Sequence, residues 1–313
     1  MSEPAHIPYR SLEQFRTALT AKYLEIYNKY DVLVQEKIHG SNISIVGTFD
    51  PSSDDNWNIM FGSRRRWILA DEKFNNIQAL FSENRANFIS LFNTLFEKYY
   101  VDGAPKIVRI YGEIYGGKYG GSTDKNAIKT QREPDYCPHN DFAFFDAFVG
   151  DVCVPAIDFI KIVPENGLKI PPVIYKGSLA DFLATFDVND FRSRVSTEFY
   201  GLDFIEHPKA TEGVVIRTVN PNPEGDEATV LKYKQTWAVE NPRINKKNNT
   251  EKTSSSKCAL IDDCIAMLNE NRITSYKSKT TIDELTDQRR IGEHVGNIVS
   301  DTMKDVVEEF PPN

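Results

Sequence analysis

The sequence lacks the features that mark several classes of protein. Its four cysteines, Cys137, Cys153, Cys258 and Cys264, include no C-x-x-C pair, which is the spacing typical of structural zinc sites. No apolar run approaches the roughly 20 residues of a membrane-spanning helix, and MSEPAHIPYR at the start contains no apolar signal core. We therefore expect no signal peptide, no transmembrane segment and no membrane partner, and a cytoplasmic or other reducing intracellular compartment.

An excess of basic residues, common in nucleic-acid-binding proteins, is also lacking. The formal net charge is -8 at pH 7, from 37 Lys and Arg against 45 Asp and Glu. Binding depends on local fields, however, and the charge is unevenly distributed. Residues 243–257, RINKKNNTEKTSSSK, are basic, whereas the segment beyond them is acidic. The overall charge therefore does not exclude a nucleic-acid partner.

The composition is that of a folded globular protein. Hydrophobic residues make up 40% of the 313 residues and aromatic residues 12%, which argues against a disordered chain. This length is sufficient for a sizeable core and for one large or two ordinary domains.

Hydrophobic periodicity predicts a front part that is rich in strands. Residues 11–27 have helical spacing, with Ser11 as the expected N-cap. Residues 33–46 predict a β-hairpin, or two strands broken at His39 and Gly40, and residues 71–100 fit two helices or one broken helix. Further strands are predicted over residues 57–63, 106–115, 142–149, 213–219 and 229–234.

Two further segments bear on domain organisation. The glycine-rich loop at residues 116–139 is of a length that usually indicates function or mobility. After residue 241 no strand pattern appears, and the apolar spacing predicts amphipathic helices. The basic segment 243–257 fits a linker or a surface loop. We therefore expect two domains, 1–243 and 244–313.

One candidate for chemistry is EKIHGSN, residues 36–42, which places Lys37 where a predicted strand ends. An amine is a good nucleophile only when deprotonated, and nearby cations or burial can lower its pKa. Gly40 would let the backbone turn tightly beside a ligand. Alone, K-x-x-G is more often a surface lysine at a hairpin turn.

Other motifs follow Lys37 in a definite order. Glu113 ends a predicted strand, Phe145 lies within one, and Glu212 precedes another. Lys232 and Lys234 alternate along a strand, so they would point to one face and would repel each other unless an anion, such as a triphosphate, lay between them. Each motif alone has an ordinary explanation as a strand-end acid, a core aromatic or a solvated edge. The ordered set is much harder to obtain by accident.

In this order the motifs resemble the covalent nucleotidyltransferase superfamily of polynucleotide ligases and RNA capping enzymes. The sequence is most similar to the RNA ligase 2 family of phage-type and RNA-editing ligases, because residues 37–40 read K-x-H-G and are followed by Ser41 and Asn42. DNA ligases and capping enzymes typically carry K-x-D-G. The resemblance extends through YGEIYGG, DYCPHNDFAFFDAF, TEGVVIR and LKYKQTWAVEN, and covers most of residues 30–243.

The resemblance implies an α+β fold. An ATP-grasp-like nucleotidyltransferase domain of antiparallel sheets with flanking helices would be followed by a small all-α C-terminal domain. It also implies a catalytic set. Lys37 would attack the α-phosphate of ATP to give lysyl-AMP, Lys232 and Lys234 would bind that phosphate and lower the pKa of Lys37, and Glu212 would support Mg²⁺ or Mn²⁺ through water.

The resemblance also implies roles for five further residues. Glu36 would contact the adenine edge, Glu113 the ribose, and Phe145 would stack on adenine. Arg64 would contact phosphate or the RNA end, and Asn42 would serve later steps. Two positions have rivals, since Arg65 and Arg66 compete with Arg64, and Phe144 competes with Phe145. His39 would orient its loop, contact RNA or be packed in the structure.

The resemblance thus implies an ATP-dependent RNA ligase that seals 3′-OH/5′-phosphate nicks in duplex RNA or an RNA–DNA hybrid, through lysyl-AMP and RNA-adenylate, as a monomer. Repair and editing both fit. The alternatives are a ligase of single-stranded or tRNA ends, a capping guanylyltransferase, and a non-catalytic RNA-binding scaffold. K-x-H-G and the lack of a C-terminal OB-fold signature count against a capping enzyme. The intact Lys37, Glu113, Glu212, Lys232 and Lys234 count against a scaffold.

Overall fold

The computed structural model describes residues 4–27, 29–117, 126–131, 134–202, 211–219, 230–235 and 238. The chain divides into two units, Met1–Thr236 and Trp237–Asn313. The basic segment and the helices predicted toward the C-terminus lie outside the described residues, so the all-α domain and the boundary at residue 243 stay predictions. Among the described residues, no helix combines the length and the apolar character needed to cross a membrane.

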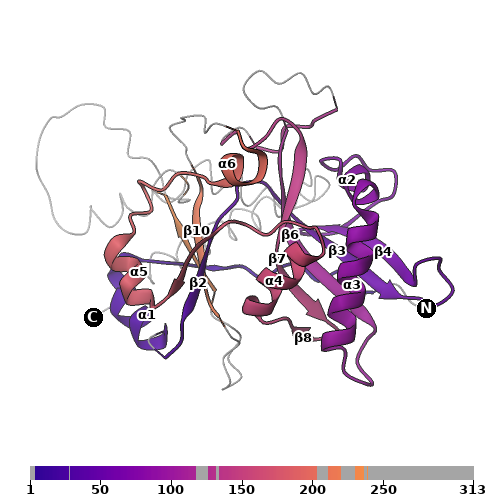
Figure 1. Ribbon diagram of the computed structural model, residues 1–313, viewed down its shortest axis with the longest axis horizontal. Helices are drawn as coiled ribbons and strands as arrows, with labels where there is room; N and C mark the ends of the chain where they lie inside the picture. The colour runs from indigo at the N-terminus through magenta and orange to yellow at the C-terminus, as the bar shows by residue number, and fades with distance from the viewer. Residues whose placement is uncertain are drawn as a thin grey trace, which may run out of the picture. The chain divides into compact units, whose positions relative to one another are not determined.

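The first unit is built on two sheets (Figure 1). The five-stranded sheet has the order β1 (Glu13–Gln14), β11 (Val230–Lys234), β10 (Gly213–Thr218), β2 (Val32–Glu36) and β9 (Val173–Gly177). The six-stranded sheet has the order β5 (Trp67–Ile68), β4 (Trp57–Ser63), β3 (Ser41–Phe49), β6 (Ile107–Gly116), β7 (Asn140–Val149) and β8 (Val152–Cys153). Every neighbouring pair is antiparallel except β1 and β11, which are parallel.

Helices pack on one face of each sheet. The six-stranded sheet carries α2 (Ile77–Glu83), α3 (Arg85–Tyr99) and α4 (Ala156–Glu165), with Phe88, Phe144 and Phe159 in their shared core. The five-stranded sheet carries α1 (Thr20–Tyr27), after a 3-10 turn at Thr17–Leu19, and α5 (Leu179–Thr185). A third, smaller core includes residues of α6 (Val195–Tyr200). This is the mixed α+β fold with predominantly antiparallel sheets that was expected.

The opposite faces of the two sheets approach each other. Leu231 and Tyr233 of β11 pack into the core of the five-stranded sheet, so Lys232 and Lys234 point to the other face, as predicted. From the same sheet, Arg217 Nη1 of β10 donates to the carbonyl of Phe145 on β7, at 2.7 Å. The candidate residues therefore lie on faces that do not contribute to the two large cores.

Most of the predicted elements are confirmed. Residues 57–63 form β4, and residues 71–100 contain two separate helices, α2 and α3. The helix predicted from Ser11 is wrong at its start, because residues 13 and 14 pair with β11 and the α-helix begins only at Thr20. The hairpin predicted over residues 33–46 is also wrong, and its alternative is right: β2 and β3 are two strands in different sheets.

Candidate active site

The end of β2 positions Lys37. Its backbone N–H donates to the carbonyl of Gly213 at 2.8 Å, which extends the pairing between β2 and β10 by one residue. The chain then leaves the five-stranded sheet and enters the six-stranded one at Ser41. Gly40 lies so close to β6 that a Cβ atom there would be 2.2 Å from the carbonyl oxygen of Ile114. Lys37 is therefore placed where the chain passes from one sheet to the other.

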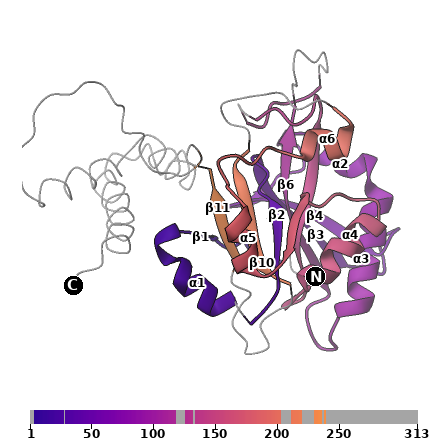
Figure 2. The ribbon, with the colours of Figure 1, turned by 60° about the vertical axis from the view of Figure 1, so that its left-hand side comes forward.

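Glu212 contacts three of the residues singled out from the sequence. Its Oε2 lies 2.6 Å from Lys37 Nζ and 3.4 Å from His39 Nδ1, and its Oε1 lies 2.9 Å from Lys234 Nζ. Figure 2 shows the strands concerned, β2, β10 and β11, side by side. Burial alone would raise the pKa of the Glu212 carboxyl, but Lys37, Lys234 and His39 outweigh burial and hold that pKa well below its usual value.

The pKa of Lys37 does not move in the predicted direction. Burial would lower the pKa of this amine, but the Glu212 and Glu113 carboxylates outweigh burial and raise it. Lowering by Lys232 and Lys234 was expected. The shift differs because the Glu212 carboxylate pairs directly with Lys37 Nζ at 2.6 Å and Glu113 adds a second negative charge nearby. The amine in this structure is therefore a protonated, ion-paired ammonium.

Glu113 lies on β6, opposite Asn42 of β3. Its Oε1 accepts a hydrogen bond from the Gly40 N–H at 3.1 Å, and Asn42 Nδ2 lies 3.4 Å from the carbonyl oxygen of Gly112. Burial raises the pKa of Glu113 to about 7, and repulsion from Glu212 adds to this against the opposing effect of Lys37. A cation near both carboxylates would favour the ionised form of Glu113.

The Glu212 carboxylate suits a hydrated divalent cation that is also bound by phosphate. Mg²⁺ usually keeps several waters and is held by one or two carboxylates together with substrate phosphates. Among the described residues there is no group of three or more His, Cys, Asp or Glu side chains that would hold a metal ion by itself. Glu212 would thus support Mg²⁺ or Mn²⁺ through water with the help of a phosphate ligand, which is the role expected of it.

Glu36, the last residue of β2, is buried. Its Oε2 accepts a hydrogen bond from the Arg194 N–H at 2.8 Å, whereas Oε1 has no hydrogen-bond partner among the described residues. Burial raises the pKa of this carboxyl to about 7. An unpaired buried oxygen is costly, and a polar ligand group at Oε1 would remove that cost. The environment therefore fits the expected contact with a base edge.

A β-bulge separates Phe145 from Phe144. Tyr111 of β6 pairs with Asp146 and the next residue, Gly112, pairs with Phe144, so Phe145 is the extra residue of β7. Phe144 is fully buried in the helix-covered core, whereas Phe145 is half-buried. Of the two rivals, Phe145 is therefore the one available to a ligand.

The three consecutive arginines have different surroundings. Arg66 makes two hydrogen bonds with Glu72, at 2.7 and 2.8 Å. The Arg64 charge acts to lower the pKa of both Lys37 and Glu113, which places it near those groups, and its Nη2 lies 3.4 Å from Ser11 Oγ. The environment therefore favours Arg64 among the three for the expected phosphate contact.

Sequence reasoning missed two side chains that hold the loop after Lys37. Tyr136 accepts a hydrogen bond from the His39 N–H at 2.9 Å, and Gln131 Nε2 donates to the Gly40 carbonyl at 2.7 Å. Both lie in the loop at residues 116–139, whose length was the only signal for them.

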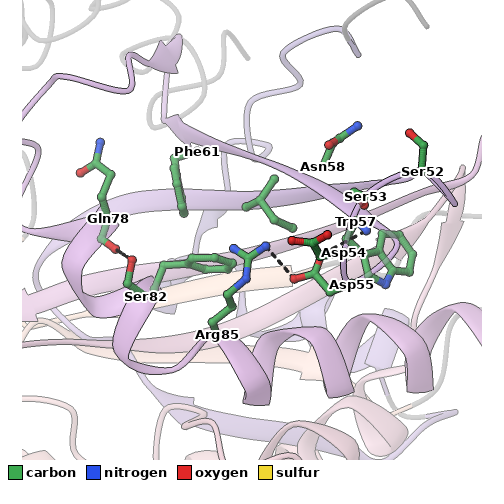
Figure 3. A pocket seen from close by; sticks show the side chains of 12 residues that line it. Ser52, Ser53, Asp54, Asp55, Trp57, Asn58, Phe61, Gln78, Ser82 and Arg85 are labelled. Carbon is green, nitrogen blue, oxygen red and sulfur yellow. Dashed lines mark hydrogen bonds and ion pairs between the residues drawn. The ribbon is translucent and has the colours of Figure 1, made fainter.

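A cavity of about 530 Å³ lies away from these residues, between β4, the loop before it and the helices α2 and α3. Its lining includes Trp57, Phe61 and Gln78, and Figure 3 shows the ion pair between Arg85 and Asp55, 2.6 Å apart. None of the predicted site residues lines it, so we do not assign the chemistry to this cavity.

The environment of Glu36 predicts a pH-dependent change in stability. The pKa of this carboxyl rises from about 4.5 to about 7 on folding. Below pH 4.5 the carboxyl is neutral in both states, and between pH 4.5 and 7 the unfolded chain ionises first. We therefore expect the wild type to lose on the order of 3 kcal/mol of unfolding free energy, relative to Glu36→Gln, over this interval.

Urea unfolding at pH 5 and pH 8 measures this difference. Glu97→Gln, at an exposed glutamate of α3, controls for the change of residue type. If the unfolding free energies of wild type and Glu36→Gln differ by the same amount at both pH values, the raised pKa of Glu36 would be contradicted.

Comparison with known proteins places this site in a family. The RNA ligase family model matches residues 30–234, which is more than half of the chain. A search of curated proteins gives no match.

Three solved structures of an RNA ligase from Naegleria gruberi are similar. A variant with ATP and Mn has 17% identity and a TM-score of 0.48, with 75% of this chain and 58% of that one covered. The structure with PPi has 16% identity and a TM-score of 0.47, with 76% and 58% covered. A second variant with ATP and Mn has 18% identity and a TM-score of 0.48, with 76% and 59% covered. The chain thus spans less than two thirds of the length of these structures. On the family match, the chain belongs to the RNA ligase family.

Proposed function

We propose that the protein is an ATP-dependent RNA ligase of the RNA ligase 2 type. It would seal 3′-OH/5′-phosphate nicks in duplex RNA or in an RNA–DNA hybrid, as a monomer. The observation that carries the proposal is the contact of Lys37 and Lys234 with opposite oxygens of the buried Glu212, at 2.6 and 2.9 Å. Glu212 thus holds the Lys37 amine at the end of β2, with the Lys234 ammonium beside it.

The first step would join AMP to Lys37. ATP is a substrate, and its triphosphate would compete with Glu212 for the ammonium group of Lys234 and would also bind Lys232. Lys37 Nζ would form a bond to the α-phosphorus as the bond to pyrophosphate breaks, and Glu212 Oε2 is the nearest acceptor for the proton that Nζ releases. A bound Mg²⁺ or Mn²⁺ would offset the charge on the leaving pyrophosphate.

The other residues would position the nucleotide. Glu36 Oε1 would meet the base edge, Phe145 would stack on the base, and Glu113 would contact the ribose. Arg64 would contact phosphate or the RNA end, and Asn42 would serve the later steps. Positioning and charge neutralisation are the main sources of rate enhancement in reactions of this type.

Two more transfers would complete sealing. A 5′-phosphate RNA end would attack the lysyl-AMP phosphorus, which frees the Lys37 amine and gives an RNA-adenylate. A 3′-hydroxyl would then attack the 5′-phosphate and release AMP. The bond between Lys37 and AMP would conserve the energy of ATP between the steps.

Loss of the amine should abolish covalent labelling. With ATP labelled at the α-phosphate, the wild type should acquire label that stays on the protein through denaturing electrophoresis, and Lys37→Arg should acquire none, because arginine keeps the charge beside Glu212 but is not a nucleophile. Lys176→Ala, at an exposed lysine of the neighbouring strand β9, is the matched control. Label on Lys37→Arg would refute the assignment, and label from GTP in place of ATP would favour a capping guanylyltransferase.

The raised pKa of Lys37 predicts the pH profile of the first step. Only the free amine attacks, so the single-turnover adenylation rate at ATP concentrations well below half-saturation, which reports the pKa of the free protein, should rise from pH 7 to 9 without a plateau, by about tenfold per unit. Glu212→Gln removes the carboxylate that raises this pKa, so its slower reaction should reach a plateau at lower pH. A plateau below pH 8 in the wild type would instead support the lowered pKa expected from Lys232 and Lys234.

Substrate geometry separates nick sealing from its alternatives. A bridging strand holds the 3′-hydroxyl beside the 5′-phosphate and so supplies the proximity that the last step needs. We expect sealing of a nicked RNA duplex, or of a hybrid nick with RNA on the 3′-hydroxyl side, to be at least about tenfold faster than joining of single strands. Faster joining of single-stranded or tRNA ends would favour the alternative ligase. Adenylation without sealing of any of these substrates would contradict the proposal.

A further inference from the structure

The N-terminal residues 4–16 are attached to both sheets. The Tyr111 hydroxyl of β6 donates to the carbonyl of Ile7 at 2.9 Å, which fixes one part of the segment on the six-stranded sheet. At the other end, the Phe15 N–H donates to the carbonyl of Lys232 at 2.8 Å, and β1 pairs with β11. The segment leads into α1, which Figure 1 shows on the side opposite β4. A single stretch of chain therefore connects the strand of Lys232 with the six-stranded sheet.

Tyr9, within this segment, lies against Phe145. The two ring centroids are 4.8 Å apart in an edge-on arrangement, and a second ring, that of Tyr111, is 5.1 Å from Tyr9. The Tyr9 hydroxyl donates to Asp146 Oδ2 at 2.9 Å. Arg217 Nη1 lies 3.9 Å from the same oxygen and donates to the carbonyl of Phe145. Phe145 is thus held through its ring by the N-terminal segment and through its backbone by β10.

The β-bulge explains why such support is needed. The extra residue of a bulge is left out of the regular strand pairing, so the pairing of β6 and β7 holds Phe145 less firmly than its neighbours. We propose that Tyr9 is a positioning residue that orients the Phe145 ring to receive the nucleobase. The inference rests on the proposed function, in which Phe145 stacks on that base.

The Tyr9 ring and its hydroxyl have separable roles. The ring makes the direct contact with Phe145, whereas the hydroxyl reaches Asp146, beside the bulge. Burial and the Asp146 carboxylate raise the pKa of this hydroxyl, so it remains a donor at neutral pH. Tyr9→Phe removes only the hydrogen bond, and Tyr9→Leu removes the aromatic contact as well.

Tyr23 offers a matched control in α1. Its hydroxyl also donates to a carboxylate, Glu13 Oε1, at 3.0 Å, and its ring also contacts a phenylalanine, Phe15, at 5.0 Å. Tyr23→Leu therefore removes the same kinds of interaction without touching Phe145. The thermal unfolding midpoint of each variant shows how far general destabilisation contributes.

Single-turnover adenylation at a series of ATP concentrations tests the proposal. Tyr9→Leu should raise the half-saturating ATP concentration by about tenfold, the upper range for loss of an aromatic contact, and should change the maximal rate much less. Tyr9→Phe should stay within about twofold of wild type because the ring contact is kept. Tyr23→Leu should raise the half-saturating ATP concentration much less than Tyr9→Leu does. An unchanged half-saturating concentration in Tyr9→Leu, or an equal rise in Tyr23→Leu, would overturn the inference.

A readout without ATP separates this inference from the proposed function. A fluorinated phenylalanine at position 145 gives a fluorine NMR resonance that depends on the surroundings of the ring. Tyr9→Leu should shift or broaden this resonance, and Tyr23→Leu should leave it unchanged. If the wild type forms no adenylate, the proposed function fails and the resonance alone decides the placement of Phe145. The same resonance in wild type and Tyr9→Leu would contradict the role of Tyr9.

Discussion

The ion pairs that Lys37 and Lys234 form with the buried Glu212 are the interaction on which the rest of the site depends. Burying charged groups costs free energy unless each is paired with good geometry, and here both oxygens of Glu212 contact an ammonium group. The three residues come from neighbouring strands, at the end of β2, just before β10 and at the end of β11. The order of strands in the five-stranded sheet therefore assembles these ion pairs, although Lys37 and Glu212 are 175 residues apart.

Close backbone approach makes this assembly possible. Gly213, next to Glu212, has a positive φ of 136°, and a Cβ atom there would lie 2.1 Å from the carbonyl oxygen of Tyr233. Gly40 is similarly close to β6. Only glycine fits such positions without displacing the neighbouring strand. The two glycines thus allow Glu212 to approach Lys234, and the Lys37 loop to approach Glu113.

The sequence predicted where the strands and helices lie better than which strands pair with each other. Alternating patterns located β4, β6, β7, β10 and β11, and alternation placed Lys232 and Lys234 on one face, because strand periodicity is a local property. The helix at Ser11 failed because β11 pairs with residues 13 and 14, which no local pattern indicates. Phe145 was chosen over Phe144 from family resemblance, whereas the bulge that exposes it depends on the register with β6. The direction of the Lys37 pKa shift depends on the Glu212 and Glu113 carboxylates lying close to its amine, which only the folded arrangement reveals.

The proposed mechanism requires the Lys37 amine to be the nucleophile that receives AMP. The most direct measurement is mass spectrometry of peptides from the wild-type protein after incubation with ATP and Mg²⁺ in the absence of RNA. We expect that the peptide containing Lys37 gains the mass of AMP, that fragmentation locates the addition at Lys37, and that a 5′-phosphate RNA end removes it. Addition of AMP at another residue, or no addition under conditions where the protein seals RNA, would contradict the account.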